Sequence, residues 1–295
     1  MRLNNKIGII TDNLRLPVRE ALVKAKELGA DGVQMYAVSG ELDPAEMSPG
    51  KRRELKAFID DLGLEVSALC GDLGGHGFQD PEANPAKIEK SKRIIELAKD
   101  LGTDIVTTHI GIVPGDETGR MYAVMQEACG ELASYAKGWD GYFAIETGPE
   151  TCDRLKKFLD CLPGDGVSVN FDPANLVMVT GDDPVQGVHV LNEYIVHTHV
   201  KDGIRLRPAD PRDVYGMHGY SRGGSHGEIA EMVERGDYFR EVPPGEGSVD
   251  FNAYFRALQD IGYGGYLTVE REVRTDPVRD ISEAVRFINK YRNPP

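Results

Sequence analysis

Two patterns of hydrophobic positions alternate along the chain. Short runs of apolar, often β-branched residues are followed by longer segments in which apolar residues recur three or four positions apart. The first pattern predicts buried strands, and the second predicts amphipathic helices that lay one face on a sheet. The strands are expected at residues 6–11, 32–36, 65–70, 104–109, 142–146, 167–172, 195–199 and 265–270. The helices are expected at residues 17–29, 48–63, 85–102, 120–137, 150–162, 184–191, 250–262 and 277–291.

Eight strand–helix units within 295 residues predict an α/β fold in which the strands close into a single (β/α)8 TIM barrel. We expect one domain over residues 1–295, because no linker rich in Pro, Ser or Gly divides the chain. One connection is unusual: residues 203–248, after the seventh strand, far exceed the few residues that normally join a strand to a helix. This insertion is rich in Gly, Arg and Tyr, and a short helix is expected within it at 228–235.

A long segment after a barrel strand emerges at the end of the barrel where this fold keeps its chemistry. Residues 203–248 are therefore expected to act as a lid or a substrate-specificity element. An ordinary surface excursion or a contact between subunits stays open as the alternative. We expect the chain to form a homo-oligomer, either a dimer or a tetramer.

The composition narrows the classes of partner. Asp plus Glu number 48 against 34 Lys plus Arg, a net charge of −14 that repels a phosphate backbone, so no nucleic acid partner is expected. No membrane is expected either, since no segment approaches the roughly 20 apolar residues of a span. The N-terminal residues MRLNNKIGII begin a strand at once and do not resemble an export signal. The four cysteines lack metal-type spacing and predict reduced thiols in a cytoplasmic protein.

Four predicted strands end in a side chain that can bind a metal: Glu146, Asp172, His199 and Glu270. Because side chains alternate between the two faces of a strand, Asp172, His199 and Glu270 each share a face with other polar residues and oppose an apolar face. The apolar face must meet the surrounding helices, so the polar face is expected to point into the barrel. The four side chains should therefore meet at the C-terminal rim of the barrel.

Three carboxylates this close together would repel one another unless one takes up a proton or a cation lies between them. One divalent metal ion removes that repulsion and also gives the imidazole of His199 a role. Three carboxylates and one imidazole suit Mn²⁺, our first choice, or Mg²⁺ and Co²⁺, and Zn²⁺ stays open. The alternative is that each acid caps a helix or forms a salt bridge just after its strand.

Five motifs occur in a recognisable order: FAIETG at 143–148, NFDPAN at 170–175, HTHVKD at 197–202, VPPGEGSVDF at 242–251 and GYGGYLTVE at 262–270. With these motifs the chain resembles the xylose-isomerase-like TIM-barrel superfamily of sugar and sugar-phosphate isomerases and epimerases. That superfamily includes relatives of D-tagatose 3-epimerase and of inosose dehydratase. The resemblance implies that Glu146, Asp172, His199 and Glu270 are the metal ligands. Of the two histidines in HTHVKD, the family's ligand is the one followed by x-Lys-Asp, so His197 is expected to be a hydrogen-bonded residue inside the barrel.

Three residues near the rim are candidates for contacts with a sugar substrate. His109 ends the fourth predicted strand and is expected to point at substrate hydroxyl groups. Tyr36 ends the second strand and is expected to form part of the pocket wall. His76 stands in the Gly-rich loop after the third strand, where an ordinary surface turn is the alternative.

Three further candidates follow the ligand motifs. Lys201 shares the face of His199 and is expected to bind a hydroxyl or a phosphate group, whereas its neighbour Asp202 is expected to form a salt bridge. The resemblance aligns Arg205 with a substrate-binding Arg of the epimerase branch. It aligns Asn175 with a second His of some members, and the amide of Asn175 can still bind a hydroxyl group.

The site predicts a sugar isomerase or epimerase that acts on a ketose or keto-sugar as its small-molecule substrate. The metal ion would chelate the carbonyl oxygen and a neighbouring hydroxyl, and Glu146 and Glu270 would act as the acid–base pair through a cis-enediolate. A metal-dependent lyase or dehydratase that acts through the same enolate on a keto-sugar, keto-glycoside or inosose is the main alternative. A non-catalytic sugar-binding subunit is a third class. The apurinic endonucleases of the superfamily fit poorly, since they need more histidines and a basic face.

Overall fold

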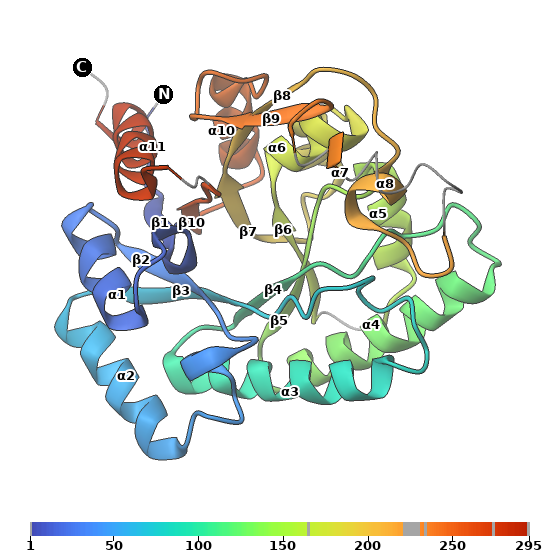
Figure 1. Ribbon diagram of the computed structural model, residues 1–295, viewed down its shortest axis with the longest axis horizontal. Helices are drawn as coiled ribbons and strands as arrows, with labels where there is room; N and C mark the ends of the chain where they lie inside the picture. The colour runs from blue at the N-terminus through green and yellow to red at the C-terminus, as the bar shows by residue number, and fades with distance from the viewer. Residues whose placement is uncertain (1, 164–165, 221–230, 233–234, 273–274, 294–295) are drawn as a thin grey trace.

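The computed structural model describes residues 2–163, 166–220, 231–232, 235–272 and 275–293. Within these residues, eight parallel strands close into a barrel in the order β1-β10-β7-β6-β5-β4-β3-β2 (Figure 1). The barrel strands are β1 (Lys6–Ile10), β2 (Gly32–Tyr36), β3 (Glu65–Cys70), β4 (Ile105–Thr108), β5 (Tyr142–Glu146), β6 (Val167–Phe171), β7 (Ile195–Val200) and β10 (Tyr266–Val269). The (β/α)8 TIM barrel predicted from the alternating pattern is thereby confirmed.

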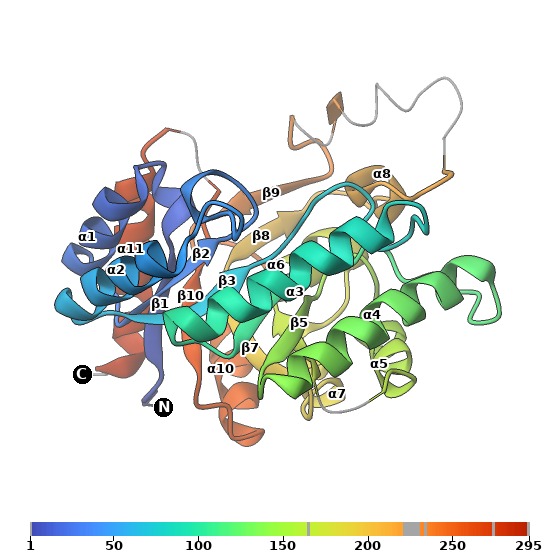
Figure 2. The same ribbon diagram turned by 90° about the horizontal axis from the view of Figure 1, so that it is seen from below.

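Helices surround the barrel and cover the outer face of its strands (Figures 1 and 2). The long helices are α1 (Val18–Glu27), α2 (Pro49–Asp61), α3 (Asn84–Leu101), α4 (Arg120–Gly138), α5 (Cys152–Asp160), α7 (Pro184–Val190), α10 (Phe251–Asp260) and α11 (Pro277–Arg292). Their boundaries follow ordinary capping chemistry: Ser48 accepts a hydrogen bond from the backbone of Lys51 at the start of α2, where Pro49 needs no donor of its own. The predicted helices agree with these bounds to within two residues at each end.

Several barrel strands have one apolar and one more polar face, as the alternation of side chains allows. On β2, Val33 and Met35 are fully buried in the hydrophobic core shared with the helices. Gln34, between them, is equally buried but hydrogen-bonds Thr107 of β4 and contacts His197 of β7. These partners come from other sides of the barrel, so the interior of the barrel holds a layer of buried polar side chains.

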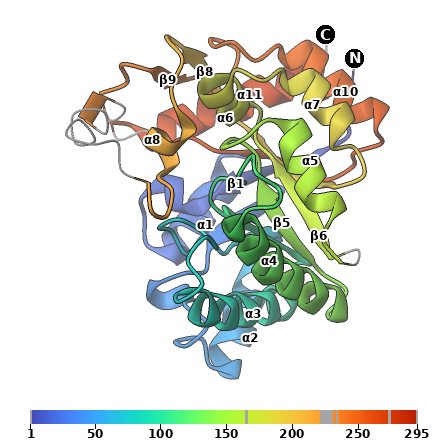
Figure 3. The same ribbon diagram turned by 90° about the vertical axis from the view of Figure 1, so that its right-hand side faces the viewer.

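Between β7 and α10 lies a segment whose internal structure the sequence pattern did not predict. It contains the antiparallel strands β8 (Asp202–Arg205) and β9 (Phe239–Val242) and the short helix α8 (Pro211–Tyr215). We call residues 202–249 the hairpin segment; its strands and α8 gather over one end of the barrel (Figures 2 and 3). The helix expected at 228–235 falls outside the described residues except at 231–232 and 235. A second unpredicted feature, α6 (Pro173–Asn175) with the π-helical turn η3 (Leu176–Thr180), follows β6 and contacts β8.

The buried carboxylate of Asp202 joins the two ends of the hairpin segment. It accepts backbone hydrogen bonds from Gly203, Gly245, Gly247 and Val249 at 2.8, 2.9, 2.9 and 3.1 Å. The salt bridge expected for Asp202 is therefore corrected, because backbone N–H groups that converge on the carboxylate satisfy its charge instead. A Cβ atom at Gly247 would lie 2.1 Å from Asp202 Oδ1, so only glycine allows this approach.

Two findings concern the expectations about membrane spans and cysteines. Among the described residues, no helix combines the length and apolarity needed to cross a membrane. The four cysteines are free thiols, of which Cys70, Cys129 and Cys152 are buried and Cys161 is exposed.

Candidate metal centre

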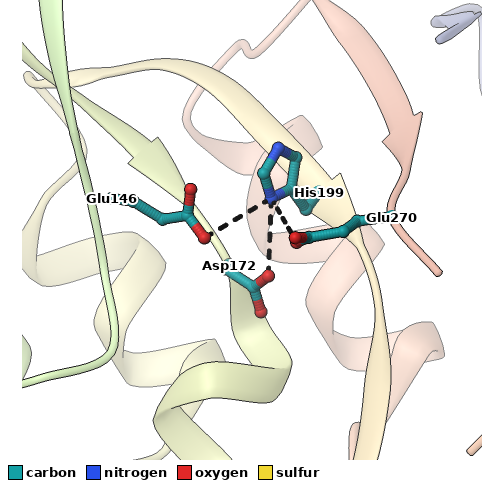
Figure 4. Close-up of side chains that lie close together, drawn as sticks. All are labelled: Glu146, Asp172, His199 and Glu270. Carbon is teal, nitrogen blue, oxygen red and sulfur yellow. Dashed lines mark ion pairs between the residues drawn. The ribbon is translucent and has the colours of Figure 1, made fainter. Parts of the chain in front are cut away.

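The four predicted ligands meet at the C-terminal ends of four neighbouring strands. Glu146 ends β5, Asp172 follows β6, His199 lies on β7 and Glu270 follows β10. One potential ligand atom from each residue lies within 4.8 Å of the others. His199 Nδ1 is 2.9 Å from Glu270 Oε2, 3.4 Å from Asp172 Oδ2 and 3.8 Å from Glu146 Oε1 (Figure 4). The alternation of strand residues thus brings together the whole predicted ligand set.

The bonding state of these atoms fits a bound cation. His199 Nδ1, Asp172 Oδ2 and Glu270 Oε2 are buried and have no hydrogen-bond partner. Buried polar atoms normally have such a partner, and three that converge on one point without one indicate a missing ligand. One imidazole nitrogen and three carboxylates form a hard, oxygen-rich donor set, which a divalent metal ion satisfies. The cluster can therefore hold a divalent metal.

Gln34 orients the imidazole ligand from inside the barrel. Its Oε1 lies 3.1 Å from His199 Nε2 and 2.9 Å from His197 Nε2. An amide oxygen only accepts, so a ring that donates to Gln34 carries its proton on Nε2, and in this tautomer the Nδ1 lone pair of His199 is available to a metal ion. His197 is the hydrogen-bonded interior residue that the sequence predicted. The role of Gln34 was missed, although it shares the inward parity of Tyr36 on β2.

Two amides hold the carboxylate of Glu146 in place. Asn175 Nδ2 donates to Glu146 Oε1 at 3.1 Å, and Asn170 Nδ2 donates to Glu146 Oε2 at 3.0 Å. The sequence predicted Asn175 as a contact for substrate, whereas its amide is already bound to a ligand carboxylate. Asp172 is oriented differently: its Oδ1 accepts from the backbone of Ala174 and Asn175, which leaves Oδ2 directed at the cluster. Asp172 is thus both a helix cap and a candidate ligand.

Without a metal ion, the carboxylates of the site favour the protonated form of the His199 imidazole. Burial raises the pKa of Glu146 to about 7. Burial acts in the same direction on Glu270, but Lys201 and His199 outweigh it and hold the pKa of Glu270 well below its usual range. Burial alone would lower the pKa of His199, yet Glu270 and Glu146 raise it well above its usual value. A divalent cation would replace the proton that these carboxylates otherwise retain on the imidazole.

A cavity of about 290 Å³ opens above the cluster. This volume is at the lower end of the roughly 300–1,000 Å³ range of small-molecule pockets. Glu146 and Glu270 line it, whereas Asp172 and His199 lie beneath its surface. Four of the predicted substrate residues also line the cavity: Tyr36, His109, Asn175 and Lys201.

Two predicted substrate residues do not reach this cavity. The ring of His76 is exposed and stands edge-on to His218, with ring centroids 6.3 Å apart. Arg205 Nη1 donates instead to the carbonyl of Thr180 at 3.1 Å, at the end of η3, where helix carbonyls lack partners within the helix. A role of either residue in binding substrate is not supported by its position.

The fold and the site define a barrel protein whose strand ends can hold a divalent metal ion beneath a small polar cavity. A family model described as xylose isomerase-like TIM barrel matches residues 22–291. The chain belongs to this family, which confirms the resemblance inferred from the five motifs.

Named relatives include both epimerases and dehydratases. The putative L-ribulose-5-phosphate 3-epimerase SgbU of Escherichia coli K12 is 26% identical over 307 residues, which cover 97% of this chain and 96% of that relative. An inosose dehydratase of Lacticaseibacillus casei is 27% identical over 152 residues, covering 50% of this chain and 46% of the relative. Among solved structures, a xylose isomerase-like TIM barrel protein from Mycobacterium smegmatis in complex with magnesium is similar with a TM-score of 0.70. It is 19% identical and covers 99% of this chain and 98% of that one.

Proposed function

We propose that the protein is a divalent-metal-dependent isomerase or epimerase of a ketose or keto-sugar, with Glu146 and Glu270 as its acid–base pair. The observation that carries this proposal is the position of these two glutamates. Asp172 and His199 come from the two strands between theirs, so the glutamates stand at opposite ends of the cluster (Figure 4). They are also the two members of the cluster that line the cavity. A substrate carbon held between them would have a carboxyl group on each side.

The environments of the two glutamates suit opposite roles. Lys201 Nζ lies 3.3 Å from Glu270 Oε2 and, with His199, keeps that group ionised, so Glu270 can accept a proton from the carbon beside the carbonyl. The C–H electron pair then moves toward the carbonyl oxygen to give an enediolate of the substrate. Glu146 lines the cavity on the other side of the cluster and would return a proton to the carbon from that side, after taking one up from solvent or from a substrate hydroxyl group. A bound divalent cation would polarise the carbonyl and stabilise negative charge on its oxygen.

The remaining parts of the proposal concern metal, substrate and assembly. The donor set favours Mn²⁺, with Mg²⁺ as a close alternative that agrees with the magnesium bound by the Mycobacterium smegmatis protein. The full-length similarity to a relative named as an epimerase supports epimerisation of a small-molecule sugar. We further propose a cytoplasmic homo-oligomer, a dimer or a tetramer.

Dehydration is the second candidate, and the similarity to inosose dehydratase over half of the chain favours it. The same proton removal by Glu270 would serve both reactions, because an enediolate can expel a hydroxyl group at the next carbon. A lyase that expels a glycosidic group would act in the same way. The two outcomes differ in whether water or a leaving group is released.

The experiment is turnover of a panel of ketoses, inososes and 3-keto-glycosides in D₂O, followed by NMR. Epimerisation predicts one deuterium at the inverted carbon and no released group, whereas loss of water or of a glycosidic group identifies a lyase. The Glu146→Gln variant should lose about 10²- to 10⁴-fold in turnover, the range of general acid–base catalysis. A Glu146→Gln protein that keeps its metal and full turnover would contradict the proposal. Glu65→Gln is a matched control, because Glu65 begins β3 and so lies at the other end of the barrel.

A further inference from the structure

The cavity has a charge pattern that bears on the class of sugar, given the proposed function. Apart from the cluster, it is lined by three more carboxylates: Asp72, Glu241 and Glu272. Among the described lining residues, the side chain that is cationic at neutral pH is Lys201. A substrate in this cavity is therefore surrounded by acceptors of hydrogen bonds and by negative charge.

The charge of Lys201 is already neutralised by carboxylates. Its side chain is buried, and its Nζ lies 3.3 Å from Glu270 Oε2, 3.7 Å from Glu272 Oε2 and 3.9 Å from Asp172 Oδ2. These three carboxylates compete with a phosphate ester for the ammonium group. His109 is similarly directed at a carboxylate, with Nε2 3.5 Å from Glu146 Oε1.

The guanidinium groups near the cavity are committed elsewhere. Arg271 pairs with Glu241 and Asp280 and donates to the carbonyl of Val242 at 2.8 Å. Arg205 donates to the carbonyl of Thr180. Within the part of the chain that the structure describes, no guanidinium lines the cavity, although arginine is the side chain best suited to a phosphate group.

Glu241 is held where it can contact a substrate. It lies on β9 of the hairpin segment, lines the cavity, and receives hydrogen bonds on Oε1 from Arg271 and from the backbone of Glu272. Both bonds anchor it to the chain just after β10. A carboxyl group fixed in this way can hydrogen-bond sugar hydroxyl groups. Burial raises the pKa of Glu241 to about 7, and above that pH its ionised form repels an anionic substituent, since like charges in a partly desolvated site interact strongly.

Part of the cavity lining is apolar. Met178 and Val179 of η3, Val214 and Tyr215 of α8, and Phe239 of β9 contribute to it. Sugar rings present C–H groups on one face and hydroxyl groups at their edge, and a lining that combines aromatic or aliphatic groups with fixed carboxylates matches both surfaces. A linear phosphorylated chain lacks the ring face.

We infer that the substrate is an uncharged cyclic polyhydroxy ketone, such as a keto-glycoside or an inosose, and not a sugar phosphate. This inference rests on the proposed function and narrows it. It differs from the substrate class in the name of the Escherichia coli relative, a ribulose 5-phosphate epimerase. Glu241 and Glu272 are then specificity-determining residues that select against the phosphate group.

The test is direct binding, by calorimetry in the presence of Mg²⁺, of neutral and phosphorylated partners with the same carbon skeleton. Suitable probes are ribulose with ribulose 5-phosphate, fructose with fructose 6-phosphate, and a 3-keto-glucoside with its 6-phosphate. The wild-type protein should bind the neutral member at least about tenfold more tightly, and the 3-keto-glucoside pair should show the largest preference. If no neutral compound binds more tightly than its ester, the inference is wrong.

Variants show whether the carboxylates cause the preference. The double variant Glu241→Gln/Glu272→Gln should reduce the preference for neutral sugars at least about threefold, mainly by improving binding of the esters. Glu246→Gln is the matched control, because Glu246 lies in the same segment but is exposed and does not line the cavity. An unchanged preference in the double variant would remove the role assigned to these two residues.

Deuterium exchange on the same compounds distinguishes a failure of the proposed function from a failure of the inferred substrate class. Exchange with the neutral sugars supports both the proposed function and the substrate class. Exchange with the phosphate esters alone overturns the substrate class and leaves the proposed function standing. Preferential binding of neutral sugars without exchange in any of them leaves the substrate class and overturns the catalytic proposal.

Discussion

The floor and the wall of the cavity are built in different ways. The floor consists of Glu146, Asp172, His199 and Glu270, carried by adjacent parallel strands of a closed barrel. Part of the wall comes from the hairpin segment, whose two strands pair only with each other in the described sheets. Strand pairing on both sides positions the floor, whereas Asp202 joins the two ends of the hairpin segment and the ion pair of Arg271 with Glu241 attaches this part of the wall to the chain after β10.

This difference separates two properties that an enzyme must combine. The floor contains the groups that can hold a metal ion and move a proton, and its geometry belongs to the barrel. The wall contains Glu241, Tyr215 and Phe239, and its geometry depends on a few contacts. Substitutions that loosen the wall should therefore lower substrate affinity without lowering metal affinity. Substitutions that remove support for the metal ligands should lower metal affinity instead.

The largest expected effect comes from removing the hydrogen bonds that join the two ends of the hairpin segment. Asp202→Ala leaves four backbone N–H groups without their acceptor, of which those of Gly203 and Val249 are buried, and this should destabilise the hairpin segment by about 3 kcal/mol. Hydrogen exchange at the amides of Gly247 and Val249 should accelerate accordingly, and substrate affinity should fall. Metal affinity, measured by titration with Mn²⁺, should change less than about threefold.

Asp250 provides the matched control for that substitution. It is exposed, and its side chain caps α10 by accepting a hydrogen bond from the backbone of Ala253 at 3.0 Å. Asp250→Ala should cost about 1 kcal/mol, as an ordinary cap does, without affecting substrate affinity. Equal loss of metal and substrate binding in Asp202→Ala would show that floor and wall are not separable.

The floor was predictable from sequence because strand alternation is a local rule. An acid at the end of an apolar strand, with inward parity, must reach the rim of a closed barrel, and Glu146 and Glu270 obey this rule. His199 was distinguished from His197 by the family motif, and the structure supports that choice because His199 Nδ1 lies within 3.8 Å of the carboxylates of Glu146, Asp172 and Glu270. Gln34 was missed because its importance depends on contacts across the barrel with residues far apart in the sequence.

The wall was not predictable, because it depends on contacts that no sequence period specifies. β8 and β9 are separated by more than 30 residues, and nothing in either strand identifies its partner. Asp202 appeared suited to a salt bridge, yet the turn at Gly245 and Gly247 supplies backbone donors instead. Arg205 was assigned by alignment to the substrate, but the local hairpin directs it to Thr180.

The next prediction concerns competition between protons and the metal ion for the floor residues. Metal binding requires Glu146 ionised and His199 Nδ1 free, and both groups hold protons in the metal-free protein near neutral pH. Since the pKa of Glu146 is about 7 and that of His199 lies well above its usual value, each metal ion bound below pH 7 should displace two protons. Apparent Mn²⁺ affinity should therefore fall up to about 100-fold from pH 7 to pH 6.

The pH profile also distinguishes floor from wall. Above pH 7, where Glu146 is ionised and His199 still holds its proton, the dependence should weaken to about tenfold per pH unit. Asp202→Ala should leave this profile unchanged, because Asp202 is not a ligand. A flat profile between pH 6 and pH 7 would contradict proton competition at Glu146.

The smallest of these effects tests the support beneath the floor. Gln34→Met keeps the volume of the side chain but removes the oxygen that lies 3.1 Å from His199 Nε2. Loss of such an orienting partner typically lowers metal affinity about tenfold or more, and we expect about tenfold for Mn²⁺, with ligand specificity unchanged. Gln79→Met is the matched control. Gln79 is equally buried, but it hydrogen-bonds the backbone of Ile112 and His218, so its substitution should lower stability without lowering Mn²⁺ affinity. If both variants bind Mn²⁺ equally well, Gln34 does not orient the ligand, and the floor depends on its strands alone.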